Sequence, residues 1–306
     1  MSTSNQFIKQ RDLLFREQQI DFKSKYVTLR GPIRRVHYLE LGRGQPLILL
    51  HGGGSNSCEW YNILQPLSKH FHLFVVDRPG CGLSDPIDYH GIDFQQSAVQ
   101  FIKNFMDALS LNQASFLAQS MGGYFAISFA IQYPEYVDRL ILIGAPAGLH
   151  FWIPLQLRLL GIRGINKILT KTLAKPSLTN VKSIHQQILV ADPDHLADDY
   201  LHLVVLGQKL PGAQEGFLSL LENVLTISGW RKDLYIGDQL HLLEMPVYFI
   251  WGDQDAFEKP KTGQQKAASI KTHHFFIVEN AGHCPWLDQP EECISLIEKC
   301  FKELAK

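Results

Sequence analysis

The stretch AQSMGG, residues 118–123, decides the fold because it places a serine between a strand and a helix. An apolar run over 115–118 precedes it, and a helical pattern over 121–132 follows it. A sharp strand-to-helix turn lifts such a serine above the sheet and needs small neighbours where strand and helix pass closely. The usual pattern, G-x-S-x-G, begins with glycine, and Ala118 is the smallest departure from it. We therefore predict that Ser120 is a nucleophile rather than an ordinary helix-capping serine.

Strand and helix patterns alternate on both sides of this turn, which is typical of a mostly parallel, doubly wound α/β sheet. The final helix is expected to have Asp288 as its N-cap and Pro290 as its first residue. Strands are expected over residues 26–29, 36–41, 47–50, 73–76, 115–118, 140–143, 247–251 and 275–278, and helices over 96–109 and 121–132.

The alternation stops in the middle of the chain. Residues 147–237 contain amphipathic helical pieces rich in Leu and Ile, such as 154–165 and 181–190, and almost no strand pattern. We therefore expect an inserted helical cap at 147–237. It divides an α/β core into a first part, 1–146, and a second part, 238–306.

Composition limits the kind of partner. The chain has 306 residues, of which 45% are hydrophobic and 19% charged, close to globular averages, so disorder of the bulk is not expected. The formal net charge is −1, so no field of the whole protein would attract DNA, RNA or an acidic membrane. We expect an apolar small molecule as partner and no nucleic acid, and the sequence leaves the oligomeric state open.

Targeting and cofactor motifs are missing from the sequence. The N-terminal segment mixes charges with apolar residues, and no stretch approaches the roughly 20 apolar residues that span a bilayer. We therefore expect a cytoplasmic protein without stable membrane insertion. Five cysteines without a CxxC pair indicate neither a disulfide framework nor a zinc site. Without HExxH, P-loop or dinucleotide fingerprint, we expect no metal and no cofactor.

Three further motifs follow predicted strands. HGGG at 51–54 can direct backbone N–H groups at a ligand, whereas His51 itself is expected to be structural. GDQD at 252–255 supplies a carboxylate, and AGHCP at 281–285 supplies a histidine suited to proton transfer. The order Ser, Asp, His, each at the carboxyl end of a strand, predicts a triad in which Ser120 is the nucleophile, His283 the base and Asp255 the orienting acid.

Together these motifs resemble the α/β-hydrolase superfamily, specifically its cap-bearing serine hydrolases, from about residue 30 to the C-terminus. The matching pieces are 51–54, DRPGCGLS at 77–84, 118–123, 251–255 and 282–283. The resemblance implies the same triad, with the acid three residues after Gly252 and therefore Asp255 rather than Asp253. It further implies an oxyanion hole formed by the backbone N–H groups of Gly53 and Met121.

The nucleophile restricts the reaction, because haloalkane dehalogenases and epoxide hydrolases of this fold use Asp where this chain has Ser120. We expect an esterase that acts on a small or medium apolar substrate through an acyl-enzyme. Gly54, Trp60 and Trp152 are expected to contact that substrate.

Two alternatives remain open. Carbon–carbon bond hydrolases of dienoates or diketones share the Ser-Met-Gly-Gly turn and a tryptophan placed like Trp60, although Cys284 replaces the Trp or Arg that often follows their histidine. Such a reaction would require a cation in the cap, for which Arg158, Arg163 and Lys167 are available. The other alternative is a ligand receptor on a hydrolase scaffold with slow turnover.

Overall fold

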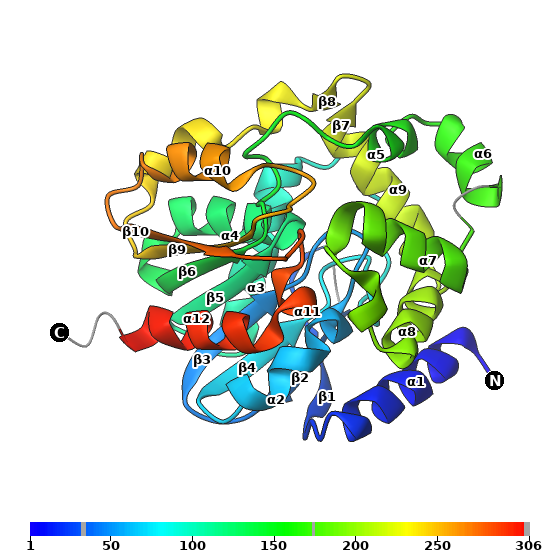
Figure 1. Cartoon of the computed structure of the whole chain (residues 1–306), viewed down its shortest axis with the longest axis horizontal. Coiled ribbons are helices and arrows are strands. Elements are labelled where there is room, and N and C mark those ends of the chain that lie inside the picture. The colour runs from blue at the N-terminus through cyan, green and yellow to red at the C-terminus, as the bar shows by residue number, and fades with distance from the viewer. Residues whose placement is uncertain (32–34, 173–174, 303–306) are drawn as a thin grey trace.

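An eight-stranded sheet runs through the centre of the computed structural model, which describes residues 1–31, 35–172 and 175–302 (Figure 1). The strand order is β1-β2-β4-β3-β5-β6-β9-β10. All neighbouring pairs are parallel except β1 with β2 and β2 with β4. The strands are β1 (Lys23–Thr28), β2 (Arg35–Leu41), β3 (Gln45–Leu50), β4 (Phe71–Val76), β5 (Ala114–Gln119), β6 (Val137–Ile143), β9 (Val247–Gly252) and β10 (His273–Val278). The predicted mostly parallel α/β sheet is confirmed.

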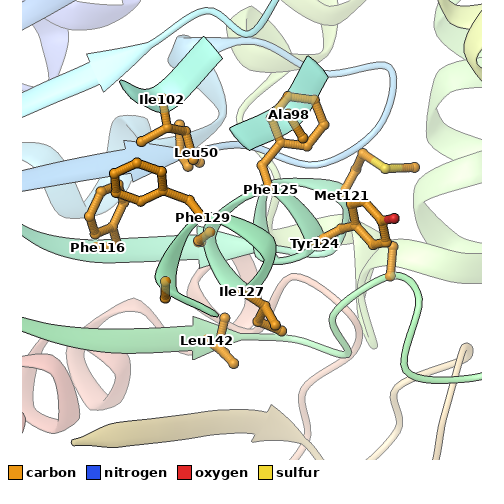
Figure 2. Packing of buried hydrophobic residues seen from close by; sticks show 14 of the residues in the cluster. Leu50, Ala98, Ile102, Phe116, Met121, Tyr124, Phe125, Ile127, Phe129 and Leu142 are labelled. Carbon is orange, nitrogen blue, oxygen red and sulfur yellow. The ribbon is translucent and has the colours of Figure 1, made fainter. Parts of the chain in front are cut away.

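Helices cover both faces of this sheet and make two apolar cores. On one face lie α3 (Phe94–Ala108), α4 (Met121–Gln132) and α10 (Pro260–Ala267). The other face is covered by α2 (Tyr61–Leu67), α11 (Pro285–Asp288) and α12 (Pro290–Lys302). Figure 2 shows the first core, where Phe125 and Phe129 of α4 pack between α3 and the sheet. The central strand β5 is buried at every position because helices cover both of its faces.

Between β6 and β9 the chain forms a helical layer above the carboxyl ends of the strands, on the right of Figure 1. Its helices are α5 (Leu155–Leu160), α6 (Ile165–Thr172), α7 (Leu178–Ile184), α8 (Asp198–Gln208) and α9 (Ala213–Val224). A short hairpin of β7 (Leu225–Thr226) and β8 (Gly229–Trp230) interrupts the helical pattern. The helix expected over 154–165 ends at Leu160, because Gly161 and Gly164 follow. The cap boundaries at 147 and 237 stay a prediction.

Two features differ from the sequence-based expectation. An N-terminal helix, α1 (Thr3–Glu17), was not predicted, and it buries Phe7, Leu14 and Phe15 against the second core beside α8. Asp288 is not the N-cap of the last helix, because it ends α11, whereas α12 begins at Pro290 as expected. The Asp288 carboxylate instead accepts hydrogen bonds from the backbone N–H groups of Ala191, Asp192 and Gly282, which have no strand or helix partner there. Among the described helices, none is both long and apolar enough to cross a membrane.

Candidate active site

Ser120 lies between β5 and α4 in a backbone conformation that non-glycine residues rarely adopt, with φ 49° and ψ −112°. The close approach of α4 to β3 explains the glycine two positions later. A Cβ on Gly122 would lie 2.1 Å from the carbonyl oxygen of Leu50, so no larger residue fits there. Ala118, in place of the first glycine of the pattern, is fully buried in the sheet. The sequence thus forms the strained turn that presents a serine above the sheet.

Asp255 and His283 form a buried pair at the ends of β9 and β10. Asp255 Oδ2 lies 2.9 Å and Oδ1 3.1 Å from His283 Nδ1. The same carboxylate accepts hydrogen bonds from the backbone N–H groups of Ala145 and Phe257, each at 2.9 Å. Burial by itself raises the pKa of the Asp255 carboxyl, but the adjacent His283 and these N–H groups hold it below its usual value. Asp255 is therefore fixed as a carboxylate that orients the imidazole.

The two loops that carry this pair touch each other, since a Cβ on Gly252 would lie 2.1 Å from the carbonyl oxygen of Gly282. Asp253 is exposed and accepts a hydrogen bond from the N–H of Ala281, as expected for an aspartate in a turn. It therefore ties the two loops together and does not pair with His283.

Ser120 and His283 line the same cavity, and a bond between them is not formed in this structure. With Nδ1 directed at Asp255, Nε2 is the ring nitrogen that remains for Ser120, and it has no hydrogen-bond partner among the described residues. Such catalytic hydrogen bonds are often long before substrate binds. The arrangement can accept a proton at Nε2 when the Ser120 hydroxyl reacts.

Gly53 and Met121 lie side by side next to Ser120, and both line the cavity. Met121 is the first residue of α4, so its N–H has no acceptor within the helix and is available to an anionic oxygen. Gly54, with φ +71°, also lines the cavity and faces the ring of Phe217. All three residues therefore lie at the cavity wall beside Ser120, and their roles as oxyanion hole and substrate contact stay a prediction.

Hydrogen bonds of Arg78 and His51 fix the glycine-rich loop, residues 51–54. Arg78 Nε donates to the His51 carbonyl at 2.8 Å and its Nη2 donates to the Gly52 carbonyl at 2.5 Å. His51 Nε2 accepts the Arg78 backbone N–H at 3.0 Å, and burial lowers the pKa of His51 to about 3. His51 is therefore a neutral structural residue, as the sequence predicted.

The cavity has a volume of about 550 Å³ and lies between the sheet and the cap. Its cap side is largely apolar and includes Leu157, Leu160, Val181, Phe217, Leu221 and Val224. Trp60 and Trp152, which were expected to contact the substrate, do not line this cavity. Trp60 is fully buried and stacks on Trp286 with ring centroids 4.3 Å apart, whereas Trp152 is 56% exposed.

Two buried polar side chains in the cavity wall were not predicted. Glu59, in the 3₁₀ turn Ser57–Trp60, has no hydrogen-bond partner at Oε1, and burial raises its pKa to about 7. His150 has no partner at either ring nitrogen, and burial lowers its pKa to about 3. No sequence pattern distinguishes either residue from its neighbours. Both can hydrogen-bond a substrate that fills the cavity.

The cations considered for a carboxylated substrate lie elsewhere. Arg158, Arg163 and Lys167 do not line the cavity, and Arg158 donates to the Ile227 carbonyl at 3.2 Å instead. Within the described part of the chain, Lys175 is the one Lys or Arg in the cavity wall, and it is exposed.

Comparisons with known proteins agree with this geometry. Residues 45–162 match the family model of the alpha/beta hydrolase fold. The chain is 30% identical over 267 residues to the 2-hydroxy-6-oxononadienedioate/2-hydroxy-6-oxononatrienedioate hydrolase of Paraburkholderia phymatum, covering 85% of this chain and 89% of the relative. It is 28% identical over 270 residues to the 2-hydroxy-6-oxo-6-phenylhexa-2,4-dienoate hydrolase of Burkholderia cepacia, covering 85% and 90%.

Among solved structures, a carboxylesterase from Bacillus subtilis superposes with a TM-score of 0.78 at 22% identity, over 98% of this chain and 99% of that one. At that identity the likeness shows the fold alone. The sequence relative of 30% identity, the matching family model and the sheet with its serine turn lead to one conclusion: the chain is a hydrolase of the α/β-hydrolase family.

Proposed function

We propose that this hydrolase cleaves an ester-type bond of a small or medium apolar substrate through an acyl-enzyme on Ser120. The observation that carries the proposal is the shared cavity. Ser120 and His283 both line it, the imidazole is oriented by Asp255, and the surrounding wall is largely apolar. An uncharged acyl group suits such a wall.

In this mechanism, His283 Nε2 removes the proton of the Ser120 hydroxyl as Oγ forms a bond to the substrate carbonyl carbon. The backbone N–H groups of Gly53 and Met121 stabilise the resulting oxyanion. When the intermediate collapses, the ester C–O bond breaks and the leaving alkoxide takes the proton from Nε2. Water then attacks the acyl-enzyme with the same proton transfer, which releases the acid and regenerates Ser120.

Charge in the cavity favours an ester over a carboxylated dienoate. Among the described residues of its wall, Lys175 is the one Lys or Arg and is exposed, while the buried Glu59 has an unpartnered oxygen and a pKa near neutrality. A substrate carboxylate near Glu59 would be repelled when Glu59 is ionised.

A carbon–carbon bond hydrolase is the second candidate, because the curated relatives are named for hydrolysis of 2-hydroxy-6-oxo dienoates and dienedioates. It would use the same Ser120, His283 and Asp255, and Lys175 could approach a carboxylate at the edge of the cavity. The bond that is cleaved is what separates the two candidates.

The test measures turnover of the purified protein on acetyl and butyryl esters and on a 2-hydroxy-6-oxo dienoate. We expect repeated, fast turnover of the esters, with kcat/KM rising from acetyl to butyryl. Ser120→Ala should lose a factor on the order of 10⁶ in kcat, because the triad acts as a unit, and an organophosphate should label Ser120 alone. Preferential dienoate turnover would establish the second candidate, and full activity of Ser120→Ala would overturn both.

A further inference from the structure

The first half of the cap has an unusual charge. Residues 147–191 contain six basic side chains, Arg158, Arg163, Lys167, Lys171, Lys175 and Lys182, and no Asp or Glu. The whole chain, by contrast, has a net charge of −1. The near-neutral total therefore hides one strongly basic segment.

The same segment exposes large apolar side chains. They are Phe151, Trp152, Leu155, Ile165, Ile168, Leu178 and Ile184, and Ile227 in the β7–β8 turn joins them. We call these eight residues, with the exposed Lys167, Lys171 and Lys175, the cap surface. These eight belong to the thirteen large apolar side chains that the described residues expose, and seven of the eight come from residues 147–191.

Contacts between the cap elements bring together the segments that carry these side chains. Arg158 of α5 donates to the Ile227 carbonyl, and the N–H of Trp230 donates to the Phe151 carbonyl at 3.0 Å, so the hairpin lies against the start of the cap. Gln156 of α5 donates to Gln187 beyond α7 at 3.5 Å. In Figure 1, α5, α6 and α7 lie together at one end of the molecule, away from α10.

The lysines of the cap surface differ from Lys182, which lies in the same basic segment and pairs with Asp194 at 2.7 Å. Lys167, Lys171 and Lys175 have no ion-pair partner among the described residues, and all three are exposed. Salt screening limits the range of electrostatic interactions at a surface to a Debye length of about 8 Å at physiological salt. A partner that approaches this surface therefore interacts with the local lysines and not with the total charge of the chain.

The cap surface continues into the cavity. Lys175 and Ile184 are exposed and also line the cavity that contains Ser120. A partner seated on the cap surface would therefore lie next to an opening of the active site.

We propose that the cap surface docks on a lipid bilayer with anionic headgroups. Lysines beside exposed aromatic and aliphatic side chains match the charge and the apolar layer of such an interface. A second copy of the chain fits less well, because two copies of one basic surface would repel across a two-fold interface. The exposed Ile and Leu side chains argue against a nucleic acid. An amphiphilic ester in that bilayer would lie next to the cavity. This consequence for catalysis rests on the proposed function, whereas the docking itself is independent of it.

Co-sedimentation of the full chain with vesicles tests the docking without any turnover. We expect binding to mixed phosphatidylcholine–phosphatidylglycerol vesicles, weak binding to phosphatidylcholine alone, and release by high salt. The variant Lys167→Glu/Lys171→Glu/Lys175→Glu should bind at least about 100-fold more weakly, since each lysine near the surface contributes about fivefold. The matched control Lys259→Glu/Lys261→Glu/Lys271→Glu changes the net charge equally, at exposed sites before, on and after α10, and should bind like the parent chain.

Trp152 gives an independent readout. The other four tryptophans, Trp60, Trp230, Trp251 and Trp286, are buried, so a change in emission on vesicle addition should come from Trp152. We expect a blue shift with the mixed vesicles, absent in Trp152→Phe. Three results would each overturn the docking: equal binding to both vesicle types, equal loss of binding in the control variant, or a dimer of the parent chain that the cap variant cannot form. Failure of the vesicle assay with intact ester turnover would leave the proposed function standing.

Discussion

Two aspartates in the turn after β9 have separate roles, because the chain must bend away from the sheet before a carboxylate can face the next loop. Asp255 faces His283, and Asp253 binds the Ala281 N–H. Asp255→Asn should lose a factor of roughly 10⁴ in kcat, the magnitude known from another triad, because the amide favours the wrong imidazole tautomer. Asp253→Asn should change kcat less than about tenfold and cost about 1 kcal/mol of stability. Ester kinetics and thermal melts of both variants check this, and a reversed order would move the acid to Asp253.

Glu59 is the residue we expect to select against anionic substrates. Above pH 7 its carboxylate is ionised in the cavity wall. We compare kcat/KM for an anionic substrate, a half-ester of a dicarboxylic acid, with kcat/KM for a neutral ester. Glu59→Gln should raise the ratio of the first to the second about tenfold, which corresponds to about 1.4 kcal/mol. Glu59→Asp keeps the charge and serves as control. A ratio that is the same in all three proteins would show that Glu59 does not face the acyl group.

The junction of β5 and α4 depends on how closely the helix passes β3. A methyl group on Gly122 would overlap the Leu50 carbonyl oxygen. Gly122→Ala should therefore push α4 away from β3 and lower stability by about 3 kcal/mol. It should also lower kcat about 100-fold, because a shift of Ser120 by about 1 Å misplaces the nucleophile.

The matched control is Gly216→Ala in α9, where the nearest atom to the new methyl group would be 3.3 Å away. It should change stability by less than about 1 kcal/mol. Urea unfolding and ester kinetics of both variants give the comparison. Normal kcat in Gly122→Ala would mean that the turn tolerates more displacement than its geometry implies.

The free energy of unfolding of the whole molecule should depend on pH through buried groups whose pKa shifts act in opposite directions. His51 and His150 have depressed pKa values of about 3. Their contributions to the free energy of unfolding are therefore present above pH 6.5 and are lost as pH falls toward 3. The raised pKa of Glu59, about 7 against 4.5, acts in reverse: its contribution is complete below pH 4.5 and is lost as pH rises through 7.

Glu59→Gln should therefore match the parent chain in acid and become relatively more stable between pH 4.5 and 7, by up to about 3 kcal/mol at about 1.4 kcal/mol per pH unit. Denaturant unfolding across this range measures the difference, and the contributions of His51 and His150 cancel in the comparison. The exposed Glu244→Gln is the matched control. A difference that does not vary with pH would contradict the raised pKa.

Local sequence patterns were enough to predict the sheet and the strand ends at which Ser120, Asp255 and His283 lie. Strand periodicity, a serine turn with small neighbours and two loops after strands are properties of short stretches, and parallel strands bring their carboxyl ends to one edge of the sheet. The sequence thereby determined the fold class and the edge of the sheet at which these three side chains lie.

What the tertiary structure alone decided is which side chains surround that edge. Trp60 was expected in the cavity and is stacked on Trp286, while Glu59, its neighbour in sequence, lines the wall. Asp288 was expected to cap a helix and instead binds three N–H groups brought together from two distant loops. Burial and pairing of this kind depend on segments far apart in the chain, so no local spacing encodes them, whereas strand and helix periodicity is fixed by neighbouring residues.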